Sequence, residues 1–293
     1  MSLSVALDVR AELGECPIWD ADEQALFFVD IKGRALHRYR PDSGEHAVMT
    51  MPDEIGCIGL RKDGSFIAGF RSGVWLPDSQ GNRETKLADN PEDQRTSRFN
   101  DGRVDLAGRF LVGTIDEPKD GGKAHLYRYD RRGLVTLASG LLTSNGVAFS
   151  PDGRMLYHSD TPTFTVWRYA YDPARGEATD KTLFARLEPA KTHQGRPDGA
   201  AVDAEGCYWT ALFEGGRIQR YASDGRLLAE YPVPARCPTM VCFGGADLKT
   251  LYVTSARTGR SGDELTAFPH SGSLFSMRVD VPGLPESRFD PSV

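Results

Sequence analysis

The sequence of 293 residues predicts an all-β protein, a six-bladed β-propeller in which residues 1–293 form one domain. Three observations favour this fold. A hairpin pattern returns six times at similar spacing, Gly and Pro interrupt the chain throughout, and no segment keeps a helical period over about a dozen residues. We therefore expect six sheets arranged in a ring around a central channel.

Each copy of the repeat has a short apolar run, a tight polar turn and a strand rich in Leu, Phe, Tyr or Trp. The copies span residues 17–29, 60–68, 104–112, 147–157, 201–209 and 243–253. The last residues of the six turns, which are 41, 44, 45, 53 and 42 positions apart, are Glu23, Gly64, Gly108, Gly153, Gly206 and Leu248. A period in the forties is the length of a four-stranded propeller blade.

We expect a third strand after each hairpin, because apolar and polar residues alternate there as they do in half-buried antiparallel strands. These strands are expected at residues 35–39, 73–76, 124–129, 164–169, 217–221 and 273–277. The N-terminal run 3–9 precedes the first repeat, so we expect it to pair with the last blade and close the ring. A β-sandwich with extra strands is the alternative, and the six similar spacings argue against it.

Composition and charge exclude several classes of function. The chain has 35 Lys and Arg against 41 Asp and Glu, a net charge of −6, and its basic residues are scattered, which argues against nucleic acids and anionic membranes as partners. It lacks an apolar stretch of about 18 residues, and Asp8 interrupts any signal sequence, so we expect a cytoplasmic protein. The five cysteines show no C-x-x-C spacing and are expected to be free, buried thiols.

The repeat also predicts a site, because the first strand of each blade lines the channel and residues at one register form a ring. The residues eight positions before the turn markers are Glu15, Gly56, Asn100, Asn145, Asp198 and Met240. Two carboxylates and two carboxamides at one end of a channel need a cation among them. The alternative is that the Asn-Gly and Asp-Gly pairs are ordinary turn dipeptides, which does not account for Glu15 before Cys16 and Pro17.

We expect Glu15, Asn145 and Asp198 to bind one divalent metal ion. Oxygen ligands favour a hard ion, with calcium expected first and magnesium, manganese, zinc or ferrous iron as alternatives. Arg98 stands two residues before Asn100, on the same strand face, and is expected to donate hydrogen bonds to an oxygen-rich ligand. The alternative for Arg98 is an ordinary surface arginine.

These motifs together resemble the gluconolactonase/regucalcin (senescence marker protein) family, and among its members the bacterial aldonolactonases. They follow one another over nearly the whole chain as LGECPIW (13–19), RFNDGR (98–103), GT (113–114), SNG (144–146), PDG (197–199) and CFGG (242–245). The resemblance implies a six-bladed propeller, a divalent metal on Glu15, Asn145 and Asp198, and hydrolysis of sugar lactones. It also implies that Arg98 and Asn100 bind substrate hydroxyls, and that one of two neighbouring acids, Asp116 or Glu117, binds substrate as well, with Glu117 expected first.

The expected substrate is a small sugar lactone, pentono- or hexono-, which water opens to the aldonic acid. Asp198 would act as both metal ligand and general base, and water activated by the ion is the open alternative to that second role. A metal-dependent esterase related to phosphotriesterases and a non-catalytic calcium- or ligand-binding propeller are the other readings. Loops 87–96, 116–123 and 189–196 would set the specificity, and the protein is expected to be a monomer or a small homo-oligomer.

Overall fold

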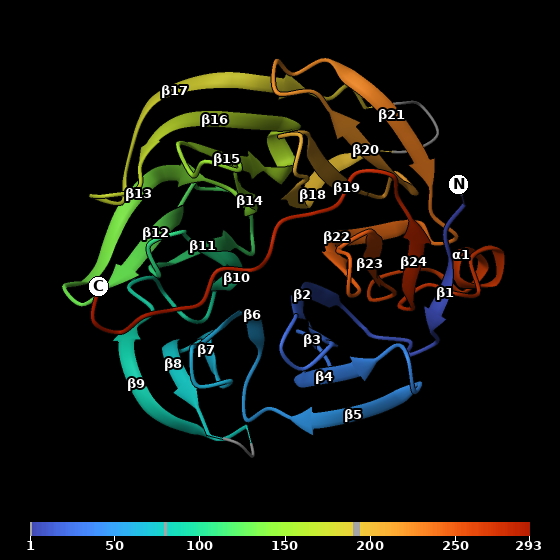
Figure 1. The fold of residues 1–293 in the computed structure, drawn as a ribbon, viewed down its shortest axis with the longest axis horizontal. Helices are drawn as coiled ribbons and strands as arrows, with labels where there is room; N and C mark the ends of the chain where they lie inside the picture. The colour runs from blue at the N-terminus through green and yellow to red at the C-terminus, as the bar shows by residue number, and fades with distance from the viewer. Residues whose placement is uncertain (1, 79–80, 190–193) are drawn as a thin grey trace.

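The computed structural model describes residues 2–78, 81–189 and 194–293, and its strands form a ring of six four-stranded antiparallel sheets (Figure 1). The predicted propeller is confirmed. Blades 1 to 3 comprise β2 (Gly14–Asp20), β3 (Ala25–Asp30), β4 (Ala35–Arg40), β5 (Glu45–Thr50), β6 (Ile55–Leu60), β7 (Phe66–Phe70), β8 (Gly73–Pro77), β9 (Arg83–Asp89), β10 (Ser97–Val104), β11 (Phe110–Asp116), β12 (Ala124–Asp130) and β13 (Gly133–Leu141).

Blades 4 and 5 continue the order, with the innermost strand of each blade first in sequence. They comprise β14 (Ser144–Phe149), β15 (Met155–Asp160), the 3-10 turn η1 (Thr161–Thr163), β16 (Thr165–Asp172), β17 (Glu177–Arg186), β18 (Arg196–Val202), β19 (Tyr208–Phe213), β20 (Arg217–Tyr221) and β21 (Leu227–Pro232). Blade 6 comprises β22 (Cys237–Gly244), β23 (Thr250–Ala256), α1 (Gly262–Ala267), β24 (Leu274–Arg278) and, as its outermost strand, β1 (Ser4–Leu7).

The N-terminal strand closes the ring as the sequence predicted. Strand β1 pairs antiparallel with β24, with Ser4 opposite Ser276 and Val5 opposite Phe275. The last blade therefore contains strands from both ends of the chain, and β1 covers the edge of β24.

The core lies between neighbouring blades, where apolar faces of adjacent sheets pack together. One cluster joins blades 1 to 3 and contains the fully buried Phe70, Phe99 and Phe110. Outer strands such as β5 are mostly exposed, whereas every residue of β2 and β3 is buried. All five cysteines are free and buried, which confirms the expectation from their spacing.

Each innermost strand has an irregularity in its pairing at the position of the predicted ring. A bulge bends a strand and redirects its side chain, so a repeated bulge aims the ring residues at the channel. The shifts lie between Glu15 and Ile18, Ile55 and Cys57, Phe99 and Gly102, Asn145 and Ala148, Pro197 and Ala200, and Pro238 and Val241.

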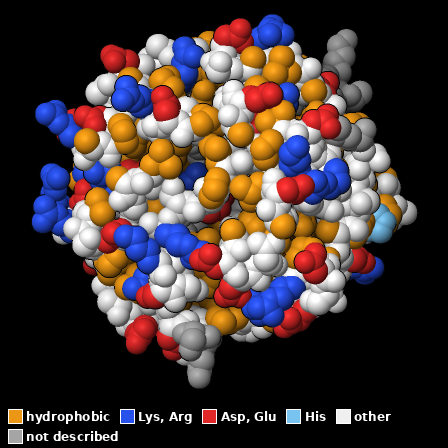
Figure 2. Space-filling model, in the orientation of Figure 1, with side chains coloured by type: hydrophobic (Ala, Val, Ile, Leu, Met, Phe, Trp, Pro, Cys, Tyr) orange, Lys and Arg blue, Asp and Glu red, His pale blue; other side chains and the backbone are white. Residues whose placement is uncertain are grey.

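The last fifteen residues, 279–293, form an extended segment that we call the C-terminal strap. It crosses one face of the ring, where it passes in red over the centre of Figure 1. Acidic and basic side chains are interspersed over this face, the scattered charge expected from the sequence (Figure 2). Backbone hydrogen bonds tie the strap to blades 6, 5, 2 and 3 through Gly283 to Leu248, Ala204 to Pro282, Phe289 to Leu60 and Asp290 to Gly108.

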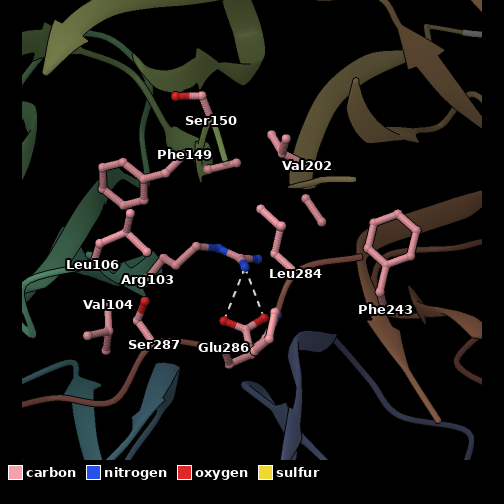
Figure 3. A pocket seen from close by; sticks show the side chains of 13 residues that line it. Arg103, Val104, Leu106, Phe149, Ser150, Val202, Phe243, Leu284, Glu286 and Ser287 are labelled. Atoms are coloured by element: carbon pink, nitrogen blue, oxygen red, sulfur yellow. Dashed lines mark hydrogen bonds and ion pairs between the residues drawn. The ribbon is translucent and has the colours of Figure 1, made fainter. Parts of the chain in front are cut away.

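Under the strap, Arg103 of β10 spans the end of the channel opposite Arg98. Its guanidinium donates to the carbonyls of Val147 and Ala200, both at 3.0 Å, and to Glu286 of the strap at 2.9 and 3.2 Å (Figure 3). Innermost strands have an unpaired edge towards the channel, and Arg103 satisfies carbonyls on two of them. The strap and Arg103 thus link the blades across this face.

We expect Glu286→Gln to lower the free energy of unfolding by about 2–4 kcal/mol, because it leaves the partly buried Arg103 charge unpaired. The control is Lys62→Met, which removes the exposed ion pair between Lys62 and Asp290 of the same strap and should cost less than about 1 kcal/mol. Urea unfolding measures both. Equal losses for the two variants would show that the inner ion pair has no special part in stability.

Candidate active site

The four polar residues of the predicted ring meet at one end of the channel. All four are buried, and they come from the innermost strands of blades 1, 3, 4 and 5. Asn100 Nδ2 donates to Asn145 Oδ1 at 2.7 Å, and Asn145 Nδ2 donates to Asp198 Oδ1 at 2.6 Å. Residues separated by about 45 and 53 positions in sequence are thereby in direct contact, as the register argument requires.

Close packing explains why two of the six ring positions, Gly56 and Met240, have no polar side chain. A Cβ at Gly56 would collide with the carbonyl group of Phe99, so the close approach of blades 2 and 3 requires glycine. Met240 is fully buried and lies against Gly199, where a Cβ would collide with its side chain. These two positions complete the ring without contributing a ligand.

Glu15 and Asp198 are two buried carboxylates close enough to influence each other. Burial raises the pKa of both well above its ordinary value, and the charge of Asp198 raises the pKa of Glu15 further. Asp101, also buried, adds a third negative charge to the field of both groups. A cation between these carboxylates would relieve their repulsion and compensate for their lost hydration.

The residues fit a hard divalent metal ion. Glu15 and Asp198 offer carboxylate oxygens and Asn145 a carboxamide oxygen, and these are the donors that calcium and similar ions prefer. Within residues 2–78, 81–189 and 194–293, no group of three His, Cys, Asp or Glu side chains is placed to hold a metal. The candidate set is of another type, because one of its three members is an asparagine.

The amides of this site are oriented by neighbours that the sequence did not single out. Thr161 Oγ1 accepts from Asn145 Nδ2 at 2.8 Å and donates to the carbonyl of Pro197, also at 2.8 Å. Asn100 Nδ2 makes a second bond, to the carbonyl of Ser144 at 3.0 Å. Thr161 follows β15 with no sequence signal of its own, because only the folded ring brings it to Asn145.

Arg98 lies beside the ring as predicted, and it is only 4% exposed. Its Nη1 donates to Asn100 Oδ1 at 2.8 Å and to the carbonyl of Phe99 at 3.1 Å. Its buried Nε has no hydrogen-bond partner among the described residues, and Glu117 Oε1 is 3.8 Å away. Arg98 is therefore an inward-lying cation with unused donor capacity, unlike the surface arginine of the alternative reading.

Glu117 lies next to Arg98 but is held mainly by another arginine. Arg71 Nη2 approaches Glu117 at 2.7 Å and Glu54 at 2.6 Å, so one guanidinium joins both carboxylates. Lys32 lies 2.8 Å from Glu54 and 3.7 Å from Glu117. Hydrogen bonds from Arg71 lower the pKa of Glu117 against the opposing effect of burial.

Glu54, Arg71 and Lys32 were missed in the sequence, although a signal existed for the first. Glu54 stands two residues before the ring position Gly56, as Arg98 stands two residues before Asn100. The same step applied to blade 5 leads from Asp198 to Arg196, which lies 2.6 Å from Glu214. Charged residues therefore stand two positions before the ring in blades 2, 3 and 5.

Loop 87–96 is anchored against blade 3. Glu92 Oε1 accepts from Thr114 Oγ1 at 2.7 Å and lies 2.8 Å from His125 Nδ1, while Glu92 Oε2 accepts from Ser97 at 2.5 Å. These bonds fix the start of β10, one residue before Arg98. Of the loop at 189–196, residues 190–193 lie outside the described part of the chain.

Comparison with known proteins identifies relatives that match nearly the whole chain. The family model for the SMP-30/Gluconolactonase/LRE-like region matches residues 13–257. A 6-deoxy-6-sulfogluconolactonase from Pseudomonas putida is 47% identical over 278 residues, covering 94% of each chain. A pentonolactonase from Haloferax volcanii is 36% identical and covers 99% of each chain.

A solved structure agrees with the fold. Regucalcin from Agrobacterium tumefaciens, a calcium-binding protein, superimposes with a TM-score of 0.92 at 29% identity, covering 98% of this chain and 96% of the other. The described part of the chain has no helix long and apolar enough to cross a membrane. With a family model matched from residue 13 to residue 257, the chain belongs to the SMP-30/gluconolactonase/LRE-like family.

Proposed function

We propose that this protein hydrolyses a sugar lactone to the corresponding aldonic acid, with one divalent metal ion held by Glu15, Asn145 and Asp198. The observation that carries the proposal is the buried contact between Asp198 and the carboxamide of Asn145, at 2.6 Å, in the electrostatic field of Glu15. Relatives named 6-deoxy-6-sulfogluconolactonase, pentonolactonase and L-arabinolactonase support this reaction. The calcium-binding structural relative supports a divalent ion, with calcium as the first candidate.

The residues around the proposed metal site account for the steps of lactone hydrolysis. When bound, a divalent ion supplies a Lewis acid that polarises the lactone carbonyl and increases the acidity of water beside it. Arg98, with its unpartnered Nε, and Asn100 would orient the substrate through its hydroxyl groups. Glu117 would help to position the substrate through its negative charge, because its Oε1 lies 3.8 Å from Arg98 Nε.

Asp198 is the proposed general base. Its Oδ1 accepts from Asn145, whereas its Oδ2 accepts no hydrogen bond from the described residues. Attack of water on the carbonyl carbon would place the released proton on Asp198, and cleavage of the ring carbon–oxygen bond would return a proton to the ring oxygen. Water made acidic by the ion alone stays the alternative, because ligation weakens a carboxylate as a base.

Two other functions would give different results in the assay described below. A metal-dependent esterase related to phosphotriesterases would use the same carbonyl chemistry, and a calcium- or ligand-binding propeller would use the ion without turnover. The cytoplasmic location, the single domain and the monomeric or small homo-oligomeric state stay predictions.

We expect metal-stripped protein to open no lactone, and added calcium, magnesium, manganese, zinc or ferrous iron to restore turnover to different extents. Initial rates are followed by pH indicator on pentono- and hexonolactones and on aryl esters, with spontaneous hydrolysis subtracted. Turnover restricted to aryl esters would favour the esterase. Metal binding without turnover of any substrate would favour the binding protein, and full activity of the stripped protein would contradict metal dependence.

A further inference from the structure

The channel mouth beside Asp198 carries basic side chains that the proposed reaction does not use. Arg196 begins β18 two residues before Asp198, the place that Arg98 occupies relative to Asn100 in β10. The two guanidinium groups therefore belong to blades 5 and 3, and blade 4 with Asn145 lies between them. A substrate seated at the site would have an arginine on each side.

Arg196 is held in place from one side only. Its Nη2 donates to Glu214 Oε2 at 2.6 Å, its guanidinium lies 5.3 Å from the ring centre of Phe213, and its Nε has no partner among the described residues. Arg260 donates to the other oxygen of Glu214 at 2.9 Å and lies 3.7 Å from Glu264. The two arginines and the two glutamates balance in charge, but the Nε of Arg196 keeps a free donor among the described residues.

Lys119 adds a second cation to the same mouth. It lies in the turn after β11 with a φ of 59°, and its backbone N–H donates to the carbonyl of Asp116 at 2.9 Å. Its ammonium forms no ion pair or hydrogen bond with the described residues. Burial lowers the pKa of Lys119, and the charges of Arg196 and Arg98 lower it further against the opposing charges of Asp198 and Glu214.

Lys119 stands two residues after Glu117, whose Oε1 is 3.8 Å from Arg98 Nε, so it lies at the same end of the channel as Arg98 and Arg196. The carboxylate of Asp198 lies at this end as well. In the proposed holoenzyme that carboxylate is a metal ligand, so its charge is no longer available to the cations above it. Like charges at one end of the channel attract an anion, and a guanidinium together with an ammonium suits an oxyanion with several acceptor oxygens.

We propose that Arg196 and Lys119 form an anion subsite that binds a negatively charged substituent on the carbon chain of the lactone. The substituent is a sulfonate, a carboxylate or a phosphate, which share charge and acceptor oxygens. Glu214 and Arg260 are positioning residues, because they orient the Arg196 guanidinium. This inference rests on the proposed lactonase function and names the substrate class of that site.

The subsite predicts specificity by charge. A neutral lactone leaves Arg196 and Lys119 without an anionic partner, whereas an anionic lactone pairs with both, so the difference appears in kcat/KM. Partly exposed charge pairs are screened by salt. The preference for the anionic substrate should therefore decline as ionic strength rises, while turnover of the neutral substrate changes little.

The test compares kcat/KM for glucono-1,5-lactone with that for its 6-sulfo, 6-carboxy and 6-phospho analogues. The variants are Arg196→Met and Lys119→Met, and the matched control is Lys123→Met, an exposed lysine of the same loop that pairs with Asp120. We expect the wild type to prefer at least one anionic lactone by about tenfold or more. Each test variant should reduce that preference by about tenfold, and Lys123→Met should leave it intact.

The outcomes separate this inference from the proposed function. Equal losses on neutral and anionic lactones, or no charge preference in the wild type, would overturn the anion subsite while leaving the lactonase function in place. No turnover of any lactone by the wild type would instead overturn the function on which the inference rests. Because the Lys119 side chain is exposed, Lys119→Met keeps the test valid if Arg196→Met does not fold.

Discussion

Asp198→Ala is expected to abolish metal binding and to lower kcat by roughly a thousandfold or more, because it removes a proposed ligand and the proposed base together. Bound metal is measured by elemental analysis after dialysis, and turnover by initial rates. The fold should survive, since Asp198 is a buried carboxylate whose pKa is raised by burial, and its removal relieves a desolvation cost.

A matched comparison separates the two roles of Asp198. Glu15→Gln removes a proposed ligand without touching the proposed base, so we expect weaker metal affinity and turnover that recovers at high metal concentration. Asp198→Ala should not recover at any metal concentration. Normal turnover of Asp198→Ala would contradict both assignments.

Arg98→Met is expected to lower kcat/KM by about a hundredfold while one metal ion still binds, because the variant loses a buried donor next to the substrate but no proposed ligand. The effect should be in KM if Arg98 binds the ground state, and in kcat if its bonds strengthen in the transition state. Steady-state kinetics on the preferred lactone distinguishes the two.

The control for Arg98 is Arg95→Met, three residues earlier. Arg95 is exposed and pairs only with Asp93 among the described residues, so its loss should leave kinetics within about twofold of the wild type. Arg98→Met with unchanged kinetics would return Arg98 to a purely structural role. Loss of metal in this variant would show that Arg98 is needed to hold the proposed ligands in place, through its bond to Asn100.

The ring of the site was predictable because a propeller repeats its geometry. Once six turns marked the register, Glu15, Asn100, Asn145 and Asp198 followed by counting, and the bulges at all six positions give the physical reason. The N-terminal closing strand was predictable in the same way, since Leu3 to Val9 had no place in any repeat and an open edge needs a partner.

Other parts depend on contacts that no local pattern encodes. Arg71 reaches Glu117 across 46 positions of sequence, and Thr161 reaches the carbonyl of Pro197 across 36. The C-terminal strap has no alternation or helical period, because its backbone pairs with turns of several blades instead of a neighbouring strand. Glu54 and Arg196 were missed but could have been predicted, because the two-residue step from the ring that selected Arg98 also leads to them.

Titration of metal into the stripped protein tests the central claim most directly, with bound metal and lactonase rate measured on the same samples. The account predicts that both rise together and level off at one ion per chain, and that Asp198→Ala shows neither rise. A rate that is already maximal before metal binds, or that continues to rise well beyond one equivalent, would contradict a single catalytic ion held by Glu15, Asn145 and Asp198.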